Sequence, residues 1–407
     1  MDNTIIAILV GVVSLVTSTV VFPFALKIAK MYKIVDNPNA RKLQRVPVPV
    51  FGGVVVYSGI LMGGLLLQAL IPSTTLAWGL VAATVMMVIG TWDDVKDLPA
   101  SFRFLIEILL LTGFILITGT YIDDLHGMWG IHELDPMVGI PLSVFMGLTL
   151  INAVNMIDGV DGYSSGYGMI ACMCVAIAFW SVWSPLMVCI AIMVFAALFP
   201  FFLHNVFGKK SRMFIGDGGT LMLGMIIVEM GFSSMSSSSK MDSLAQNGMS
   251  IMAFLTAVAL IPLFDTFRVF LMRLLRGRSP FKPDKTHLHH LFIDMGFSHL
   301  GAALFILSIN MMVVLIWLLT WKLGASMEVQ FYIVFVLGFL VTMGFYKFMK
   351  IQQNGGPMDE GYPQGTKLWH VMCRLGAWTH RENKPFWRFM QYLMDGPLFR
   401  GKFTSRP

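Results

Sequence analysis

Residues 139–162 read GIPLSVFMGLTLINAVNMIDGVDG, and the first half of this stretch decides the fold class. The run 139–151 is almost wholly apolar and continuous, which is typical of a membrane-spanning helix, whereas strands of a membrane barrel alternate apolar and polar residues. Of the 407 residues in the chain, 56% are hydrophobic and only 13% are charged, against about a quarter charged in a soluble domain. We therefore predict an all-α, multi-pass integral membrane protein.

Similar apolar blocks recur along the chain, and most are long enough to cross about 30 Å of hydrocarbon. The sequence predicts eleven spans, near residues 4–29, 51–71, 77–91, 104–119, 138–154, 164–180, 185–203, 213–232, 250–272, 302–320 and 330–347. The first block is long enough to span and follows no basic residue, so we do not expect a cleaved signal peptide.

The basic residues predict the orientation of these spans. Every Lys and Arg except Lys240 and Lys322 falls on one side of an eleven-span arrangement. Short cytoplasmic loops are rich in Lys and Arg, so we expect the N-terminus outside and the C-terminus in the cytoplasm. The basic, aromatic stretch 351–407 is then a cytoplasmic tail, which we expect to lie on the anionic surface of the membrane.

Polar clusters gather on this same predicted cytoplasmic side. The segment WDDVKDLP (92–99) contains Asp93 and Asp94, which point about 100° apart on a helix and so have different tasks, whereas Asp97 would share a face with Asp93. A solvated loop with a helix cap is the alternative for this segment. The next cluster follows the opening apolar run, as a stripe on one helix face: Asn152, Asn155, Asp158 and Asp161.

Ionisable groups at membrane depth are costly and usually functional, although such a stripe could also be a polar helix end among lipid headgroups. Asp217 lies among three glycines in FIGDGGT (214–220) at the start of a span. Free backbone N–H groups at a helix start bind anions, and a carboxylate there can hold a cation that bridges to phosphate. Capping alone would explain Asp217 but not the glycines.

A histidine-rich loop, RGRSPFKPDKTHLHHLF (276–292), follows a span whose last turns carry Asp265 and Arg268, spaced to pair. Zinc is one interpretation, but no cysteine or clearly placed fourth ligand accompanies the histidines. A clamp for phosphates or sugar hydroxyls fits the mixture of basic groups better. The first loop, 36–53, adds further basic residues, which an ordinary cytoplasmic loop would also explain. Carboxylates and an amide suited to Mg²⁺, beside groups suited to phosphate, predict phosphoryl transfer at one membrane face.

Four of these motifs stand together in the order found in one family. WDDVKDLP, NAVNMIDGVDG, FIGDGGT and DTFRVFLMRLLRGRSPFKPDKTHLHH resemble the polyprenyl-phosphate N-acetylhexosamine-1-phosphate transferases, glycosyltransferase family 4, over roughly residues 1–350. THLHHLF resembles the bacterial branch that uses undecaprenyl phosphate and GlcNAc-1-phosphate. An HHHFE-like pattern, typical of the phospho-N-acetylmuramoyl-pentapeptide transferases, is absent.

The resemblance implies transfer of GlcNAc-1-phosphate from UDP-GlcNAc, or a related UDP-sugar, to undecaprenyl phosphate, with release of UMP, as the first step of a cell-surface polysaccharide. It implies Mg²⁺, with Mn²⁺ able to replace it, a homodimer in the bacterial cytoplasmic membrane, an active site facing the cytoplasm, and no nucleic-acid partner.

The implied site residues fall into four groups. Asp217 and Asn155 resemble the metal ligands, and Asp93 or Asp94 resembles the residue that binds or deprotonates the lipid phosphate. Phe214, Asp158, Asp161 and Arg45 resemble nucleotide-binding residues; sugar and diphosphate contacts are implied for His287, His289, His290, Lys285 and Arg268.

Some features fall outside the resemblance. Gln44 replaces a histidine that is common in the family, and Val50 replaces a polar residue, which weakens any role for the first loop. The remaining alternatives are pentapeptide-transferase-like activity, a transporter or a membrane scaffold. A transporter would place its acidic groups near the midplane between internal repeats, which this sequence lacks.

Overall fold

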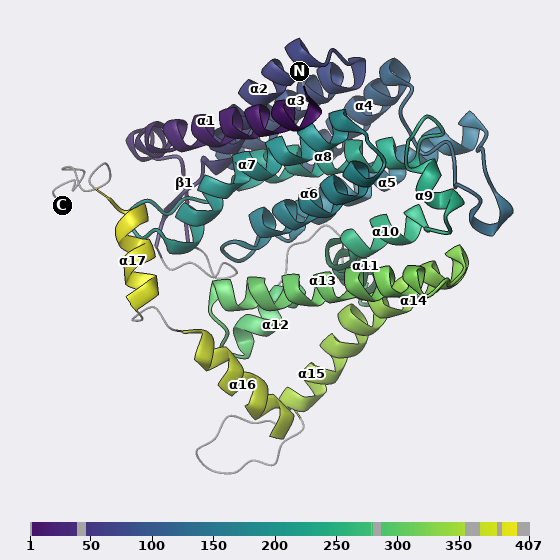
Figure 1. The fold of residues 1–407 in the computed structure, drawn as a ribbon. Helices are drawn as coiled ribbons and strands as arrows, with labels where there is room; N and C mark the ends of the chain where they lie inside the picture. Colours follow the sequence, from purple (N-terminus) through teal and green to yellow (C-terminus); the bar gives the residue numbers. More distant parts are fainter. Residues whose placement is uncertain are drawn as a thin grey trace.

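The computed structural model describes residues 2–38, 46–277, 279, 286–354, 367–380 and 385–396 as a bundle of long helices (Figure 1). Nine single helices are long and apolar enough to cross a membrane: α1 (Asn3–Met31), α2 (Gly52–Leu70), α3 (Thr74–Lys96), α4 (Ala100–Thr118), α5 (Pro136–Met156), α6 (Tyr163–Ser181), α7 (Pro185–Phe207), α8 (Gly216–Met235) and α13 (His299–Lys322).

A tenth span covers Met327–Gln353 and contains α14 (Met327–Phe339), a π-helical segment η2 (Leu340–Gly344) and α15 (Phe345–Asn354). The shorter elements are β1 (Val35–Asp36), β2 (Val48–Pro49), η1 (Met128–Gly130), α9 (Asp242–Gln246), α10 (Ile251–Val258), α11 (Leu260–Leu275), α12 (Leu288–Asp294), α16 (Lys367–Thr379) and α17 (Pro385–Met394). The all-α prediction is confirmed; β1 and β2 form a two-residue antiparallel pair in the described chain.

The predicted ninth span is broken, so the described chain has ten spans, or eleven if the bent pair counts as one. Helices α10 and α11 meet at 72° around Ala259. Pro262 explains the break, because its ring clashes with the carbonyl four residues earlier, at Val258. Asn310 of α13 satisfies the freed backbone groups: its Nδ2 donates to the Val258 carbonyl at 3.1 Å, and its Oδ1 accepts the Ile261 N–H at 3.0 Å.

Helix α8 lies at the centre of the first eight spans. It packs against α2, α3 and α5, while α1 packs on α2 and α7. Within its most apolar window 89% of the residues are buried, whereas no other span exceeds 61%. Helix α8 therefore starts inside a ring of other helix ends, and its first residues meet polar groups from several of them.

Glycines allow this close packing. A Cβ atom on Gly90 of α3 would lie 2.5 Å from the backbone N and Cα of Gly218 in α8. A Cβ on Gly53 of α2 would lie equally close to the Gly219 N. The backbones of α2 and α3 therefore touch the first turn of α8, and no side chain can move aside to make room.

Gly90→Ala is expected to lower the thermal stability of the detergent-solubilised protein. The added methyl group must push α3 away from α8, and overpacking of this kind costs about 1–3 kcal/mol. Gly231→Ala is the matched control, because a Cβ on Gly231 of α8 would meet nothing within 4 Å. Equal midpoints for the two variants in a thermal unfolding assay would contradict the close contact.

The C-terminal helices run across the ends of the spans (Figure 1). Helix α16 buries Trp369, Met372 and Gly376, and the Thr379 hydroxyl accepts the Ser298 N–H at 2.9 Å. Its opposite face exposes an apolar stripe: Leu368, Val371, Leu375 and Trp378. The stripe is consistent with the predicted location at the membrane surface, which stays a prediction, as does the orientation of the bundle.

Candidate functional site

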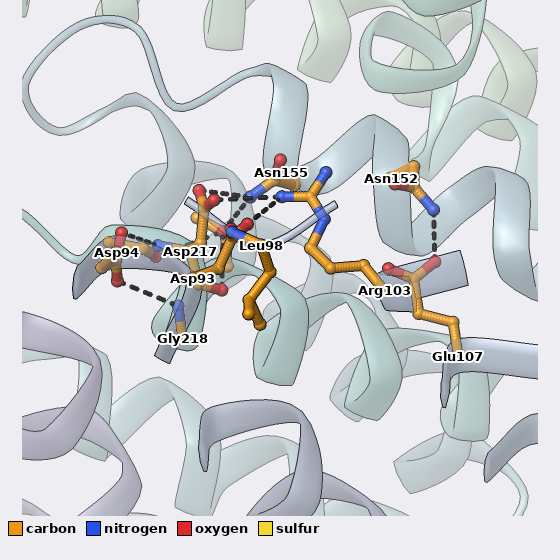
Figure 2. Close-up of polar contacts among 11 residues, drawn as sticks. Asp93, Asp94, Leu98, Arg103, Glu107, Asn152, Asn155, Asp217 and Gly218 are labelled. Atoms are coloured by element: carbon orange, nitrogen blue, oxygen red, sulfur yellow. Dashed lines mark hydrogen bonds and ion pairs between the residues drawn. The ribbon is translucent and has the colours of Figure 1, made fainter. Parts of the chain in front are cut away.

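Three helix ends bring the first polar cluster together (Figure 2). Asp93 comes from the last turn of α3, Asp217 from the first turn of α8, and Arg103 from the first turn of α4. The Arg103 Nη1 lies 2.6 Å from the Asp93 Oδ2 and 3.1 Å from the Asp217 Oδ2. One guanidinium therefore holds together two carboxylates that lie far apart in the sequence.

Asp93 and Asp94 have different surroundings, as their angular separation predicted. Asp93 is buried and also accepts the Leu98 N–H at 2.6 Å. The Asp94 carboxylate instead accepts the backbone N–H groups of Asp217 and Gly218, at 3.0 and 3.4 Å. It therefore lies at the positive end of α8, where a negative charge is stabilised. Helix α3 ends at Lys96, so the exposed Asp97 adopts a left-handed conformation and shares no helical face with Asp93.

Asn155 joins the last turn of α5 to this cluster. Its Nδ2 donates to the Asp217 Oδ1 and to the Thr220 Oγ1, both at 2.8 Å (Figure 2). The pairing of Asn155 with Asp217, which the sequence could only suggest through the family resemblance, is therefore a direct contact. Asp217 accepts from an amide through one oxygen and from a guanidinium through the other.

The turn after α5 carries a second acidic pair. The Ser164 hydroxyl donates to Asp158 at 2.6 Å, and burial raises the pKa of Asp158 to about 7, against the effect of that hydrogen bond. Asp161 forms an ion pair with Arg212, and its Oδ2 lies 3.0 Å from the His299 Nδ1. Near neutral pH Asp158 is thus available in either protonation state, while Asp161 is held between two basic groups.

Phe214 lies close to these residues. The Arg212 Cζ lies 5.7 Å from the centre of the Phe214 ring, and the Phe214 N–H donates to the Pro49 carbonyl at 2.8 Å. The ring is half-buried. A planar base could lie on such a ring, which supports the nucleotide-binding role implied for Phe214.

The histidine loop is anchored by a buried ion pair. The Arg268 Nη2 lies 2.6 Å from the Asp265 Oδ1, which confirms the pairing predicted from their spacing. Arg268 also donates to the Thr286 carbonyl at 2.5 Å, and Asp265 lies 2.9 Å from the His287 Nδ1. Arg268 is almost fully buried. Its described contacts therefore hold the start of the loop in place.

His289 is the residue through which the histidine loop contacts the turn after α5. Its ring lies against Gly159, where a Cβ atom would come within 2.1 Å of the His289 Nε2. Burial, followed by the neighbouring His290 and His287, lowers the pKa of His289 well below its ordinary value. Near pH 7 the imidazole is therefore neutral, and it can offer a hydrogen bond but no charge. His290 remains half-buried beside it, with the ring centres 4.4 Å apart.

Gly159→Ala is expected to lower activity about tenfold, because the methyl group forces the buried His289 ring away from the turn that carries Asp158 and Asp161. Transfer assayed with purified protein measures the effect. Gly113→Ala is the control, since a Cβ there would meet nothing within 4 Å. Equal activity of the two variants would mean that the contact between loop and turn does not matter.

Two predicted contact residues, Arg45 and Lys285, lie outside the described residues. All other predicted site residues lie in one of three neighbouring groups: Asp93, Asp94, Asn155 and Asp217; Asp158, Asp161 and Phe214; Arg268, His287, His289 and His290. Gly159 connects the last two groups through His289.

The sequence analysis did not identify several polar partners in this region. Among these partners are Arg103, which the sequence distinguishes only as a basic residue, and Glu107, one turn further along α4. The Asn152 Nδ2 donates to the Glu107 Oε2 at 2.5 Å, and the other Glu107 oxygen is buried without a partner (Figure 2). A carboxylate inside a predicted span was itself a signal, because such residues are rare and usually functional.

The oxygen donors fit Mg²⁺ only as a shared site. Within the described ranges, no three His, Cys, Asp or Glu side chains converge as a metal site. Mg²⁺, however, is commonly held by one or two carboxylates together with water and substrate phosphates. Asp217 is partly exposed and, with the Asn155 amide, offers such a partial set. The residues therefore fit a metal that binds together with a phosphate-bearing substrate.

Comparison with known proteins points to one family. Residues 76–235, which include Arg103, Asn155 and Asp217, match the model for Glycosyl transferase family 4. The undecaprenyl-phosphate alpha-N-acetylglucosaminyl 1-phosphate transferase of Escherichia coli (strain K12) is 29% identical over 281 residues, which cover 68% of this chain and 73% of that protein. The probable undecaprenyl-phosphate N-acetylglucosaminyl 1-phosphate transferase of Bacillus subtilis (strain 168) is 28% identical over 349 residues, covering 83% and 91%.

Proposed function

We propose that the chain, whose residues 76–235 match the model for glycosyl transferase family 4, acts as a member of that family and transfers GlcNAc-1-phosphate from UDP-GlcNAc to undecaprenyl phosphate. An oxygen of the lipid phosphate attacks the sugar-bearing phosphorus of the donor. The bond from this phosphorus to the bridging oxygen breaks, and UMP leaves with that oxygen. The product is undecaprenyl-diphosphate-GlcNAc, the starting lipid for a cell-surface polysaccharide. The relatives carry this activity in their names.

One observation carries the proposal: a guanidinium and two carboxylates lie in contact where α3, α4 and α8 meet. Phosphoryl transfer requires mainly positioning and neutralisation of charge on the phosphate oxygens. Arg103 supplies positive charge at this point. Asp217 and Asn155 would hold Mg²⁺, which neutralises diphosphate charge when bound. Asp93, through its ion pair with Arg103, or Asp94, at the start of α8, would orient the lipid phosphate. No general base is needed because that phosphate is already ionised.

The other two groups would bind the donor. Phe214 offers its ring to uracil, and Asp158 and Asp161 accept hydrogen bonds from the nucleoside. His289 lies against Gly159 of the turn with His290 beside it, and both would contact the sugar and the diphosphate. Arg268 and His287 act through the loop, since both are held by the buried Asp265.

The proposed location is the bacterial cytoplasmic membrane, with the site facing the cytoplasm. The support is the distribution of Lys and Arg, nearly all of which fall on the side that carries the site. A homodimer follows from the family resemblance, and light scattering of the purified protein would measure it.

The decisive experiment is UMP release by detergent-solubilised protein given undecaprenyl phosphate and a panel of UDP-sugars. UDP-GlcNAc is expected to release UMP, and the lipid product is expected to carry GlcNAc. Release of UMP without lipid phosphate, or no release with any UDP-sugar, would contradict the proposal. Efflux of an unmodified solute from proteoliposomes would instead favour a transporter.

A further inference from the structure

The C-terminal helix α17 is bound to the loop between α7 and α8, which leads into the proposed donor site. Asp395 follows α17, and its carboxylate accepts the backbone N–H groups of Lys209, Lys210 and Ser211 at 3.0–3.1 Å. The Ser211 hydroxyl also donates to it, at 2.9 Å. Hydrogen bonds to a charged group contribute more than neutral ones. One side chain from the tail therefore fixes three consecutive backbone units.

The rest of α17 adds little to this attachment. Its Phe386 and Trp387 rings pack on Phe207 at the end of α7, with centres 6.2 and 4.8 Å away. No residue of α17 is fully buried. Apolar burial is the main source of docking energy elsewhere in proteins, so a helix this exposed depends strongly on Asp395 and on the two ring contacts with Phe207.

The loop leads directly to the donor groups. Arg212 follows Ser211 and pairs with Asp161, and its guanidinium lies near the Phe214 ring. Asn205, in the last turn of α7, donates to the Met213 carbonyl and accepts the Gly162 N–H at 2.7 Å. The loop is thus attached to the acidic turn on its inner side and to Asp395 on its outer side.

We propose that Asp395 is a positioning residue for the donor site. By holding the loop 209–212, it keeps Arg212 in its ion pair with Asp161, next to the Phe214 ring. The inference rests on the proposed function for its substrate. Without Asp395 the loop keeps the hydrogen bond from the Lys30 Nζ to the Lys210 carbonyl, at 2.9 Å, but loses the acceptor of three consecutive N–H groups and becomes less ordered. The donor must then select the ordered fraction, which weakens its apparent affinity without altering the reacting groups.

Two variants test this in the full-length protein. Asp395→Ala removes the acceptor, and Trp387→Ala weakens the docking of α17 while Asp395 stays. Glu328→Gln is the control: it also removes one half-buried carboxylate, but at the far end of the bundle, where Glu328 accepts the Trp129 N–H. Asp395→Glu keeps the charge and is expected to restore most of the wild-type behaviour.

The first measurement is independent of activity. Trypsin cleaves after Lys209, Lys210 and Arg212 only when the loop leaves its anchored shape. Asp395→Ala is expected to be cleaved there about tenfold faster than wild type, which corresponds to the loss of about 1.4 kcal/mol of charge-assisted hydrogen bonding. Trp387→Ala is also expected to be cleaved faster than wild type, because α17 then docks less tightly on Phe207. Cleavage at the wild-type rate in Asp395→Ala would overturn the anchoring.

The second measurement separates positioning from catalysis. In Asp395→Ala the KM for UDP-GlcNAc is expected to rise about tenfold, with kcat within twofold of wild type and the KM for lipid phosphate unchanged. A fall in kcat at unchanged donor KM would overturn the positioning role. If wild-type protein releases no UMP, the proposed function fails, and the trypsin result still decides whether Asp395 anchors the loop.

Discussion

Asp217→Asn is expected to reduce transfer by about 160- to 900-fold, while the protein still inserts and folds. The amide keeps the size of the side chain and can still accept from Asn155, so the packing around the start of α8 is retained. It loses the negative charge that pairs with Arg103 and would hold Mg²⁺. Removing one preorganised electrostatic contact of this kind costs about 3–4 kcal/mol in the transition state.

The measurement is kcat/KM across a range of Mg²⁺ concentrations, with UMP affinity as a second readout. UMP affinity is expected to rise with Mg²⁺ in the wild type and to be independent of Mg²⁺ in Asp217→Asn. Asp97→Asn is the matched control: it makes the same change at the same end of the bundle, on an exposed residue whose left-handed conformation suits asparagine. Normal turnover in Asp217→Asn would refute the metal assignment.

The fold was predictable because membrane spans are defined by local composition. Length and apolarity identify α5 or α7 without knowledge of their neighbours. The points where helices end or break are harder to predict, as the break at Ala259 shows. Pro262 can be read from the sequence. The bend also needs Asn310, about fifty residues away, which hydrogen-bonds the backbone groups of Val258 and Ile261 that the bend leaves without helical partners. A local pattern contains no information about that partner.

The same distinction holds within the site. Asp265 and Arg268 are three residues apart on one helix, so their pairing followed from helix geometry. Arg103 and Asp217 are separated by 114 residues, and their contact depends on how α3, α4 and α8 pack. In the tail, composition revealed only a basic, aromatic character. Asp395 is unremarkable in sequence, and its role depends on N–H groups 184–186 residues earlier.

Arg103→Gln has the second-largest expected effect, a fall in kcat/KM of about a hundredfold. Without the guanidinium, Asp93 and Asp217 repel each other and would repel the substrate phosphates. Asp93 is also left buried with only the Leu98 N–H as a described partner. Removing one partner of a buried ion pair typically costs about 3–5 kcal/mol of stability, so unfolding of the variant is followed alongside its kinetics.

A double-mutant cycle separates the two effects of Arg103. Asp93→Asn in the Arg103→Gln background removes the unpaired buried charge, so it is expected to restore thermal stability but not transfer. If Arg103 served only to neutralise Asp93, activity would return as well, and the proposed contact with phosphate would be wrong. Arg103→Lys tests geometry: it keeps the charge but loses the planar fork that reaches both carboxylates, so partial activity is expected. Lys322→Gln, which removes a cation that lies over the Trp321 ring at the far end of α13, is the control and should leave kcat/KM unchanged.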